Sequence, residues 1–104
     1  MPHAYVALLL IHLHFPDARS LKEKRKELSS VKAQLHTRLG VAVSEVDGQD
    51  TWQRSTLAVA LTGGSPGRCV DAADNVVRYL DSRFPQGVRV ERRVASWTDL
   101  ESLR

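Results

Sequence analysis

The densest charge in the sequence is the run from Arg19 to Glu27, in which five residues are cations. They are Arg19, Lys22, Lys24, Arg25 and Lys26. Ser20 is followed three residues later by Glu23, which is a capping box and predicts that this run forms the first turns of a helix. Cations at a helix N-terminus oppose the macrodipole at a cost of about 0.3–1 kcal/mol each. We therefore expect either a solvated face or a contact surface for an anionic partner.

Three carboxylates, Glu45, Asp47 and Asp50, form an acidic counterpart to the basic run. If they lie near Lys22, Lys24 or Arg25, part of the run belongs to an internal ion-pair network. Lys24 and Arg25 fill the turn between Leu21 and Leu28, so at least one of them must lie at the edge of the core face. A pair between Arg25 and a carboxylate at the edge of the core would explain why Arg25 interrupts the aliphatic stripe of the helix. The sequence leaves both alternatives open.

Histidines are the residues that most invite a catalytic or metal-binding interpretation. His12 and His14 stand two apart in a predicted strand, so their side chains point to the same face. With Asp17, Glu45, Asp47 or Asp50 they could form a metal or acid/base cluster. Two histidines at the end of a strand more often cap polar groups or lie at a solvent edge. An enzyme that uses His14 with Asp47 or Asp50 remains the third functional hypothesis.

Other chemical motifs are missing from the sequence. Cys69 is expected to be a small buried residue, because no histidine is placed near it to activate a thiol. The glycines of residues 63–67 lack both the dinucleotide-binding spacing and the lysine-serine pair of a P-loop. We therefore expect no cofactor, no metal ion and no enzymatic activity.

Hydrophobic patterning predicts the elements that must position these residues. Strands are predicted over residues 4–14, 41–47, 54–62 and 88–95, and helices over residues 20–39 and 66–84. The helical stripes are Leu21, Leu28, Val31, Leu35 and Leu39 in the first helix, and Val70, Ala73, Val77, Leu80 and Phe84 in the second. The tail that contains Trp97 is expected to add one helical turn.

This βαββαβ order predicts an α+β fold of the ferredoxin-like class, with residues 1–104 as one domain. The expected sheet is antiparallel, has strand order 4-1-3-2 and carries both helices on one face. The first strand is apolar on both of its faces, which favours a central position. The face without helices would expose Val6, Leu8 and Leu10 beside Ala42, Ala58 and Ala60. Such a patch usually marks an interface, and a homodimer is the commonest way to cover it.

Aromatic residues are few and do not favour base stacking on the sheet. The strand over residues 54–62 contains none, so RNA would be bound through its phosphates and the helix cations. Arg89, Arg92 and Arg93 offer a second basic surface. Trp52 and Trp97 belong either to core or dimer packing or to a partner contact.

Composition restricts the class of protein. The 104 residues are 42% hydrophobic and 26% charged, with a net charge of +3, which permits nucleic-acid contact without requiring it. A single cysteine fits a reducing compartment. The apolar run over residues 4–11 is too short to span a bilayer and lacks the flanks of a signal peptide. We therefore expect a cytoplasmic protein with no membrane contact.

Two segments, residues 13–25 and 45–54, resemble the two signatures of the YlxP-like bacterial proteins, a family of unknown function. The resemblance covers nearly the whole chain and departs at the start of the second helix. It implies a small dimeric ferredoxin-like domain, and a ribosome-linked role because the family's genes often neighbour those for translation initiation and ribosome maturation. It brings no activity, cofactor or catalytic residue. The candidates for ion pairs or a partner contact in these segments are His14, Glu45, Asp47, Asp50, Trp52 and Arg54.

The first functional hypothesis is thus a non-enzymatic accessory protein that contacts RNA or a ribosomal particle through the basic helix start. The second is a dimeric protein-interaction module with no nucleic-acid role, suggested by the apolar sheet face and Trp52.

Overall fold

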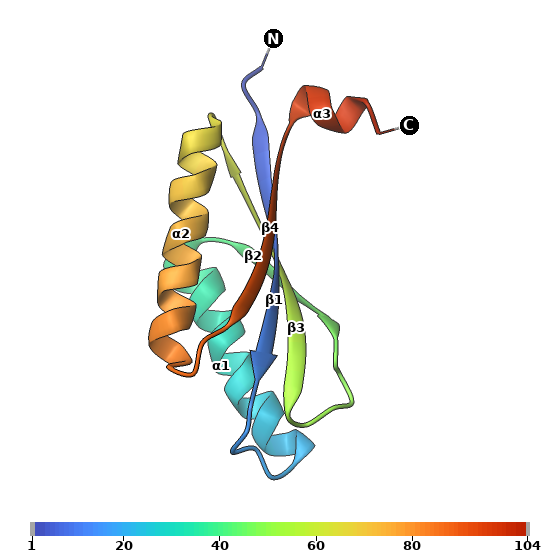
Figure 1. Ribbon diagram of the computed structural model, residues 1–104, viewed down its shortest axis with the longest axis vertical. Helices are drawn as coiled ribbons and strands as arrows, with labels where there is room; N and C mark the ends of the chain where they lie inside the picture. Colours follow the sequence, from blue (N-terminus) through green and yellow to red (C-terminus); the bar gives the residue numbers. More distant parts are fainter. Residues whose placement is uncertain (1, 104) are drawn as a thin grey trace.

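The computed structural model describes residues 2–103 and contains four strands and three helices (Figure 1). The elements are β1 (Tyr5–His14), α1 (Leu21–Leu39), β2 (Ala42–Asp47), β3 (Arg54–Gly63), α2 (Pro66–Arg83), β4 (Arg89–Ser96) and α3 (Trp97–Glu101). The predicted βαββαβ order is confirmed. The helical turn expected in the tail is α3, which begins directly after β4.

The four strands form one antiparallel sheet in the order β2-β3-β1-β4, which is the predicted order 4-1-3-2. In this sheet β1 lies between β3 and β4, so the central position predicted from its two apolar faces is confirmed. Helices α1 and α2 cover one face of the sheet, and α3 projects from the opposite side, at the end where β4 finishes (Figure 1). The fold is therefore an α+β fold of the ferredoxin-like class.

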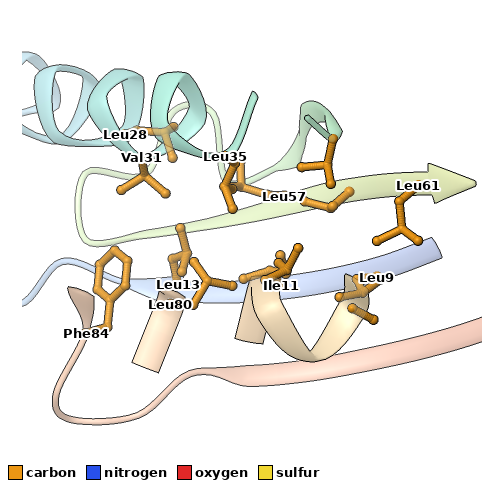
Figure 2. Close-up of a cluster of buried hydrophobic side chains, with 14 of the residues drawn as sticks. Leu9, Ile11, Leu13, Leu28, Val31, Leu35, Leu57, Leu61, Leu80 and Phe84 are labelled. Carbon is orange, nitrogen blue, oxygen red and sulfur yellow. The ribbon is translucent and has the colours of Figure 1, made fainter. Parts of the chain in front are cut away.

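The hydrophobic core lies between the sheet and helices α1 and α2 (Figure 2). Its main side chains are Leu9, Ile11 and Leu13 from β1, Leu57 and Leu61 from β3, Leu28, Val31 and Leu35 from α1, and Leu80 from α2 with Phe84 just beyond it. Phe15 and Phe84 meet edge to face, with ring centroids 5.8 Å apart, and close the core at one end. Each such residue contributes roughly 1.5–3 kcal/mol when it is fully buried.

The buried stripe of α2 includes the predicted Ala73, Leu80 and Phe84 but differs from the prediction at two places. Cys69 and Val76 are fully buried, whereas Val70 is 40% exposed and Val77 is only half-buried. Both sets of residues have helical spacing, so periodicity alone could not separate them. In the structure Cys69 packs closely against the end of β3, where a Cβ at Gly63 would lie 3.0 Å from its Sγ.

The sheet face away from α1 and α2 remains largely uncovered by the described residues. Leu8 in the middle of β1 is 47% exposed, and small side chains surround it on β2 and β3. Trp97 and Leu100 of α3 border the same face in an apolar depression of about 230 Å³. Trp52 and Trp97 are 46% and 52% exposed, so neither is part of the core. We call this surface the open face.

Candidate nucleic-acid interface

Lys24 is the only lysine or arginine of residues 2–103 that is fully buried. Its Nζ donates hydrogen bonds to the backbone oxygens of Gly48 and Thr51, at 2.5 and 2.6 Å. The Glu45 Oε2 lies 3.4 Å from the same nitrogen. A buried ammonium is tolerated only when it is paired and hydrogen-bonded in this way. Contrary to our expectation, Lys24 has no surface to offer a partner and serves to hold α1 against β2 and its following loop.

The sequence contained a signal for this burial. Lys24 precedes Leu28 by four residues, and the spacing continues through Val31 and Leu35. Lys24 therefore occupies a regular position of the buried stripe of α1. Of the two residues expected at the edge of the core, Lys24 is the one that is buried, and Lys24 rather than Arg25 pairs with a carboxylate.

Arg25 is exposed and donates from its Nη2 to the Gln49 backbone oxygen at 3.2 Å. Glu45 accepts a second bond from the Ser55 hydroxyl at 2.6 Å, which orients the carboxylate toward Lys24. Together these contacts fix the loop between β2 and β3, and with it the outer side of α1.

Gly48 starts this loop with a φ of +78°, a region that favours glycine. A Cβ at this position would lie 2.9 Å from the Arg54 backbone oxygen. The turn brings the Thr51 amide to the Gly48 oxygen at 3.1 Å, and the same oxygen accepts from Lys24. Asp47 accepts from the Gly48 amide at 2.8 Å. The close turn therefore presents its carbonyl oxygens to the buried lysine.

Three cations of the basic run, Arg19, Lys22 and Lys26, are exposed, and none of them forms an ion pair within residues 2–103. Ser20 caps the helix by accepting from the Glu23 amide at 3.1 Å. The Glu23 carboxylate accepts from the Arg19 amide at 2.5 Å, and so does not reach the Ser20 amide that a regular capping box would use. The side chain of Arg19 remains available.

The charges on α1 are separated around the helix. Lys22, Arg25 and Lys26 are spaced by three and four residues and share the outward side. Glu23 and Glu27 lie toward α2, where they line an open depression of about 460 Å³ that Lys26 also borders. The exposed cations thus form a basic side of α1, which we define as Arg19, Lys22, Arg25 and Lys26.

Asp47 and Asp50 are exposed and form no ion pair within the part of the chain that the structure describes. Of the three carboxylates that could have neutralised the basic run, only Glu45 does so, and it pairs with Lys24 alone. The internal network therefore accounts for one cation of five.

His14 of β1 and Arg54 of β3 lie directly opposite each other at one end of the sheet. Both side chains lie on the open face. They line a pocket of about 320 Å³ together with His12, Leu13, Ser55, Thr56 and Arg89. His14 forms no hydrogen bond or ion pair with Asp47 or Asp50 in the described structure. The arrangement gives the acid/base hypothesis no support.

His12 is held from both sides. Its Nε2 lies 2.8 Å from the Glu91 Oε2, and its Nδ1 lies 3.3 Å from the Thr56 hydroxyl. The hydrogen bond with His12, followed by the charge of Arg89, holds the pKa of Glu91 below its ordinary value. Glu91 is therefore the charged partner that orients the imidazole.

Arg92 lies on the helix face of β4 and pairs with Asp74 of α2 at 3.0 Å. Arg89 and Arg93 alternate with it and lie on the open face. The second basic surface expected from these three arginines is therefore divided between two faces.

Within residues 2–103, no group of three or more His, Cys, Asp or Glu side chains is arranged to hold a metal ion. Cys69 is a free, buried thiol. None of the described helices combines the length and apolar character needed to cross a bilayer.

Comparison with known proteins identifies the family. A family model described as "Protein of unknown function (DUF503)" matches residues 6–101. The chain is 35% identical over 78 residues to the uncharacterized protein YlxP of Bacillus subtilis (strain 168), covering 75% of this chain and 80% of that protein. The de novo designed protein Foldit4 matches with a TM-score of 0.55 at 12% identity, covering 88% of this chain and 96% of the design, which shows a similar fold alone. The chain therefore belongs to the DUF503 family, whose function is unknown.

Proposed function

We propose that this protein is a non-enzymatic cytoplasmic accessory that contacts RNA or a ribosomal particle through the basic side of α1. The observation that carries the proposal is the exposure of Arg19, Lys22 and Lys26 without an ion pair in residues 2–103. These charges oppose the helix dipole, and no carboxylate of residues 2–103 forms an ion pair with them. The phosphates of a nucleic acid would supply the negative charge that pairs with these cations.

Rigidity supports the same proposal. Lys24 joins the first turns of α1 to β2 and to its following loop through three contacts. The neighbouring cations therefore project from a helix that is already held in place. Its backbone does not have to become ordered when a partner binds, which lowers the entropic cost of binding. The family resemblance implies a ribosome-linked role, so ribosomal RNA is the first partner to test.

The test is co-sedimentation of the purified protein with ribosomal subunits at low and moderate salt. We expect the wild-type protein to bind, and to bind less as salt rises, because phosphate contacts release counterions. The double variant Lys22→Gln and Lys26→Gln should lose binding. A variant with Arg68→Gln and Arg78→Gln removes the same charge from exposed positions of α2 and should retain it.

Loss of binding in both double variants would mean that only net charge matters, and would contradict a specific role for α1. Absence of wild-type binding at low salt would overturn the proposal. Circular dichroism and denaturant unfolding of each variant establish that the fold is intact.

A second candidate is a dimeric protein-interaction module, and the open face is the observation that favours it. Leu8 is 47% exposed on a central strand, and Leu100 and Leu103 are 45% and 77% exposed at the far end. An apolar surface of this kind on a small domain is most often covered by another chain. A second copy would bury Leu8 against its own symmetry mate.

Sedimentation equilibrium of the wild type and of Leu8→Arg tests this candidate. We expect a dimer that becomes a folded monomer in the variant. A wild-type protein that stays monomeric at high concentration would contradict the dimer. A dimer that survives Leu8→Arg would place the interface elsewhere.

A further inference from the structure

The pocket on the open face, at the end where β1 finishes, is separate from the basic side of α1. It has a volume of about 320 Å³ and receives side chains from three strands. His12 and His14 come from β1, Arg54 and Thr56 from β3, and Arg89 from the start of β4. Because alternate residues of a strand share a face, these side chains all lie on the open face.

The pocket lining is rich in hydrogen-bond donors. Arg54 and Arg89 each carry a guanidinium with five N–H groups, and His14 adds an imidazole. No Asp or Glu lines the pocket. Glu91 lies just outside it, where it binds His12 at 2.8 Å and stands 3.6 Å from Arg89. Arg54 has no ion pair among the described residues.

The arrangement of the donors selects the kind of anion. They approach from β1, β3 and β4, and so from more than one direction. A carboxylate presents two oxygens in one plane and matches a single guanidinium, whereas a tetrahedral phosphate can accept from several donors around it. A volume of about 320 Å³ is roughly ten times the share of one liquid water, so the phosphate can carry an attached group.

The surface beside the pocket fits such an attached group. One pair further along the sheet, Leu10 of β1 faces Ala58 of β3 on the open face. Both are half-buried, so a sugar joined to the phosphate would rest on the apolar side chains of Leu10 and Ala58. Glu91 of β4, which pairs with Leu10 in the sheet, borders this surface and could accept from a sugar hydroxyl.

We infer that this pocket binds a phosphate group between Arg54, His14 and Arg89. If the phosphate belongs to an RNA backbone, the inference deepens the proposed function and rests on it. Free phosphate and the phosphate of a nucleotide would be bound by the same donors. In the RNA case the protein would hold the nucleic acid at two places, the basic side of α1 and the pocket.

The experiment is an NMR titration of the full-length protein with two probes, inorganic phosphate and a short single-stranded RNA without terminal phosphates. We expect saturable shifts of the His12 and His14 ring signals and of the amides of residues 54–56. Arg54→Gln and Arg89→Gln should each weaken binding about tenfold, as loss of a charged hydrogen bond does. Arg93 lies on β4 and on the open face, as Arg89 does, but outside the pocket. Arg93→Gln removes the same charge and should therefore change the affinity little.

The two probes separate the two proposals. If RNA binding fails in the Lys22→Gln and Lys26→Gln variant but is unaffected by Arg54→Gln and Arg89→Gln, the pocket is overturned and the proposed function stands. If RNA does not bind but phosphate shifts the pocket signals and Arg54→Gln abolishes the shifts, the pocket stands and the proposed function fails. If neither probe shifts these signals, the pocket is overturned; the proposed function is overturned as well if RNA also leaves the amides of α1 unshifted. The same spectra report whether each variant is folded.

Discussion

Two clusters of charge meet at the same end of the sheet and differ in how they are neutralised. Ser55 points toward the helices and supports Glu45, which pairs with the buried Lys24. Its neighbours Arg54 and Thr56 point the opposite way, into the pocket of the open face. Side chains of β3 alternate between the two faces of the sheet. Ser55 therefore belongs to the closed cluster, in which the charge of Lys24 is paired, and Arg54 belongs to the open cluster, in which the pocket cations lack full pairing.

The difference between the clusters lies in their acceptors. The Lys24 ammonium donates to two carbonyl oxygens and pairs with one carboxylate. In the pocket, Arg89 stands 3.6 Å from Glu91, which also binds His12, and Arg54 has no ion pair among residues 2–103. A cation whose acceptors come from its own chain stabilises the fold, whereas cations that outnumber their acceptors remain available to a ligand.

The largest effect is expected for Lys24→Ala, which would break the closed cluster. The variant leaves a largely buried Glu45 carboxylate and two carbonyl oxygens without their donor, so the free energy of unfolding should fall by about 3–5 kcal/mol. Urea unfolding measures the change. Lys22→Ala is the control from the same helical turn and should stay within about 0.5 kcal/mol of the wild type. Equal effects of the two variants would contradict a special role for the buried lysine.

The next effect is expected for Gly48→Ala, which disturbs the acceptors of Lys24 rather than the lysine. The position has a φ of +78°, and the new Cβ would meet the Arg54 oxygen at 2.9 Å, so we expect a loss of roughly 1–3 kcal/mol. Gly67→Ala is the contrasting control, because its Cβ meets nothing within 4 Å at the start of α2. That change should stabilise by about 0.4–1 kcal/mol.

Substitutions in the open cluster, which consists of the pocket residues, should weaken ligand binding and hardly change the free energy of unfolding. Arg54→Gln should leave the free energy of unfolding within about 0.5 kcal/mol of the wild type, because Arg54 is exposed. If it contacts one RNA phosphate, the slope of log K against log salt should become shallower by about one. Fluorescence anisotropy over a salt series measures this slope. An unchanged slope, with a normal fold, would mean that Arg54 touches no phosphate.

The smallest effect on stability is expected for Glu91→Gln. A carboxyl with a lowered folded-state pKa stabilises the protein above its ordinary pKa and loses this contribution as pH falls through the folded value. The wild type should therefore melt slightly above the variant at neutral pH, and the difference should vanish in acid. Because the variant also removes the carboxylate beside the pocket, it should bind inorganic phosphate more tightly. Weaker binding would indicate that orientation of His12 matters more than charge.

Much of the fold was predictable because each element carries its own signal. The capping serines, the β1 run and the helical stripes predicted the element order, and the handedness of the crossovers left one sheet order. On α2 the burial of Ala73, Leu80 and Phe84 was predicted, but Cys69 and Val76 were missed, because spacing does not distinguish them from residues 70 and 77. The candidate site was only partly predictable. The basic run was found, but the separation of Lys24 from its neighbours was not.

By itself, the sequence determined which residues are charged, where the helices begin and that β1 is apolar on both faces, because propensity, capping and periodicity act within a few residues. Only the tertiary structure decided which cation is buried, since Lys24 depends on carbonyl oxygens more than twenty residues away. It also brought Arg54 and Arg89 to one pocket across β1, through the pairing of three strands. Contacts between distant segments depend on strand register and on how the helices pack, and these are properties of the whole chain.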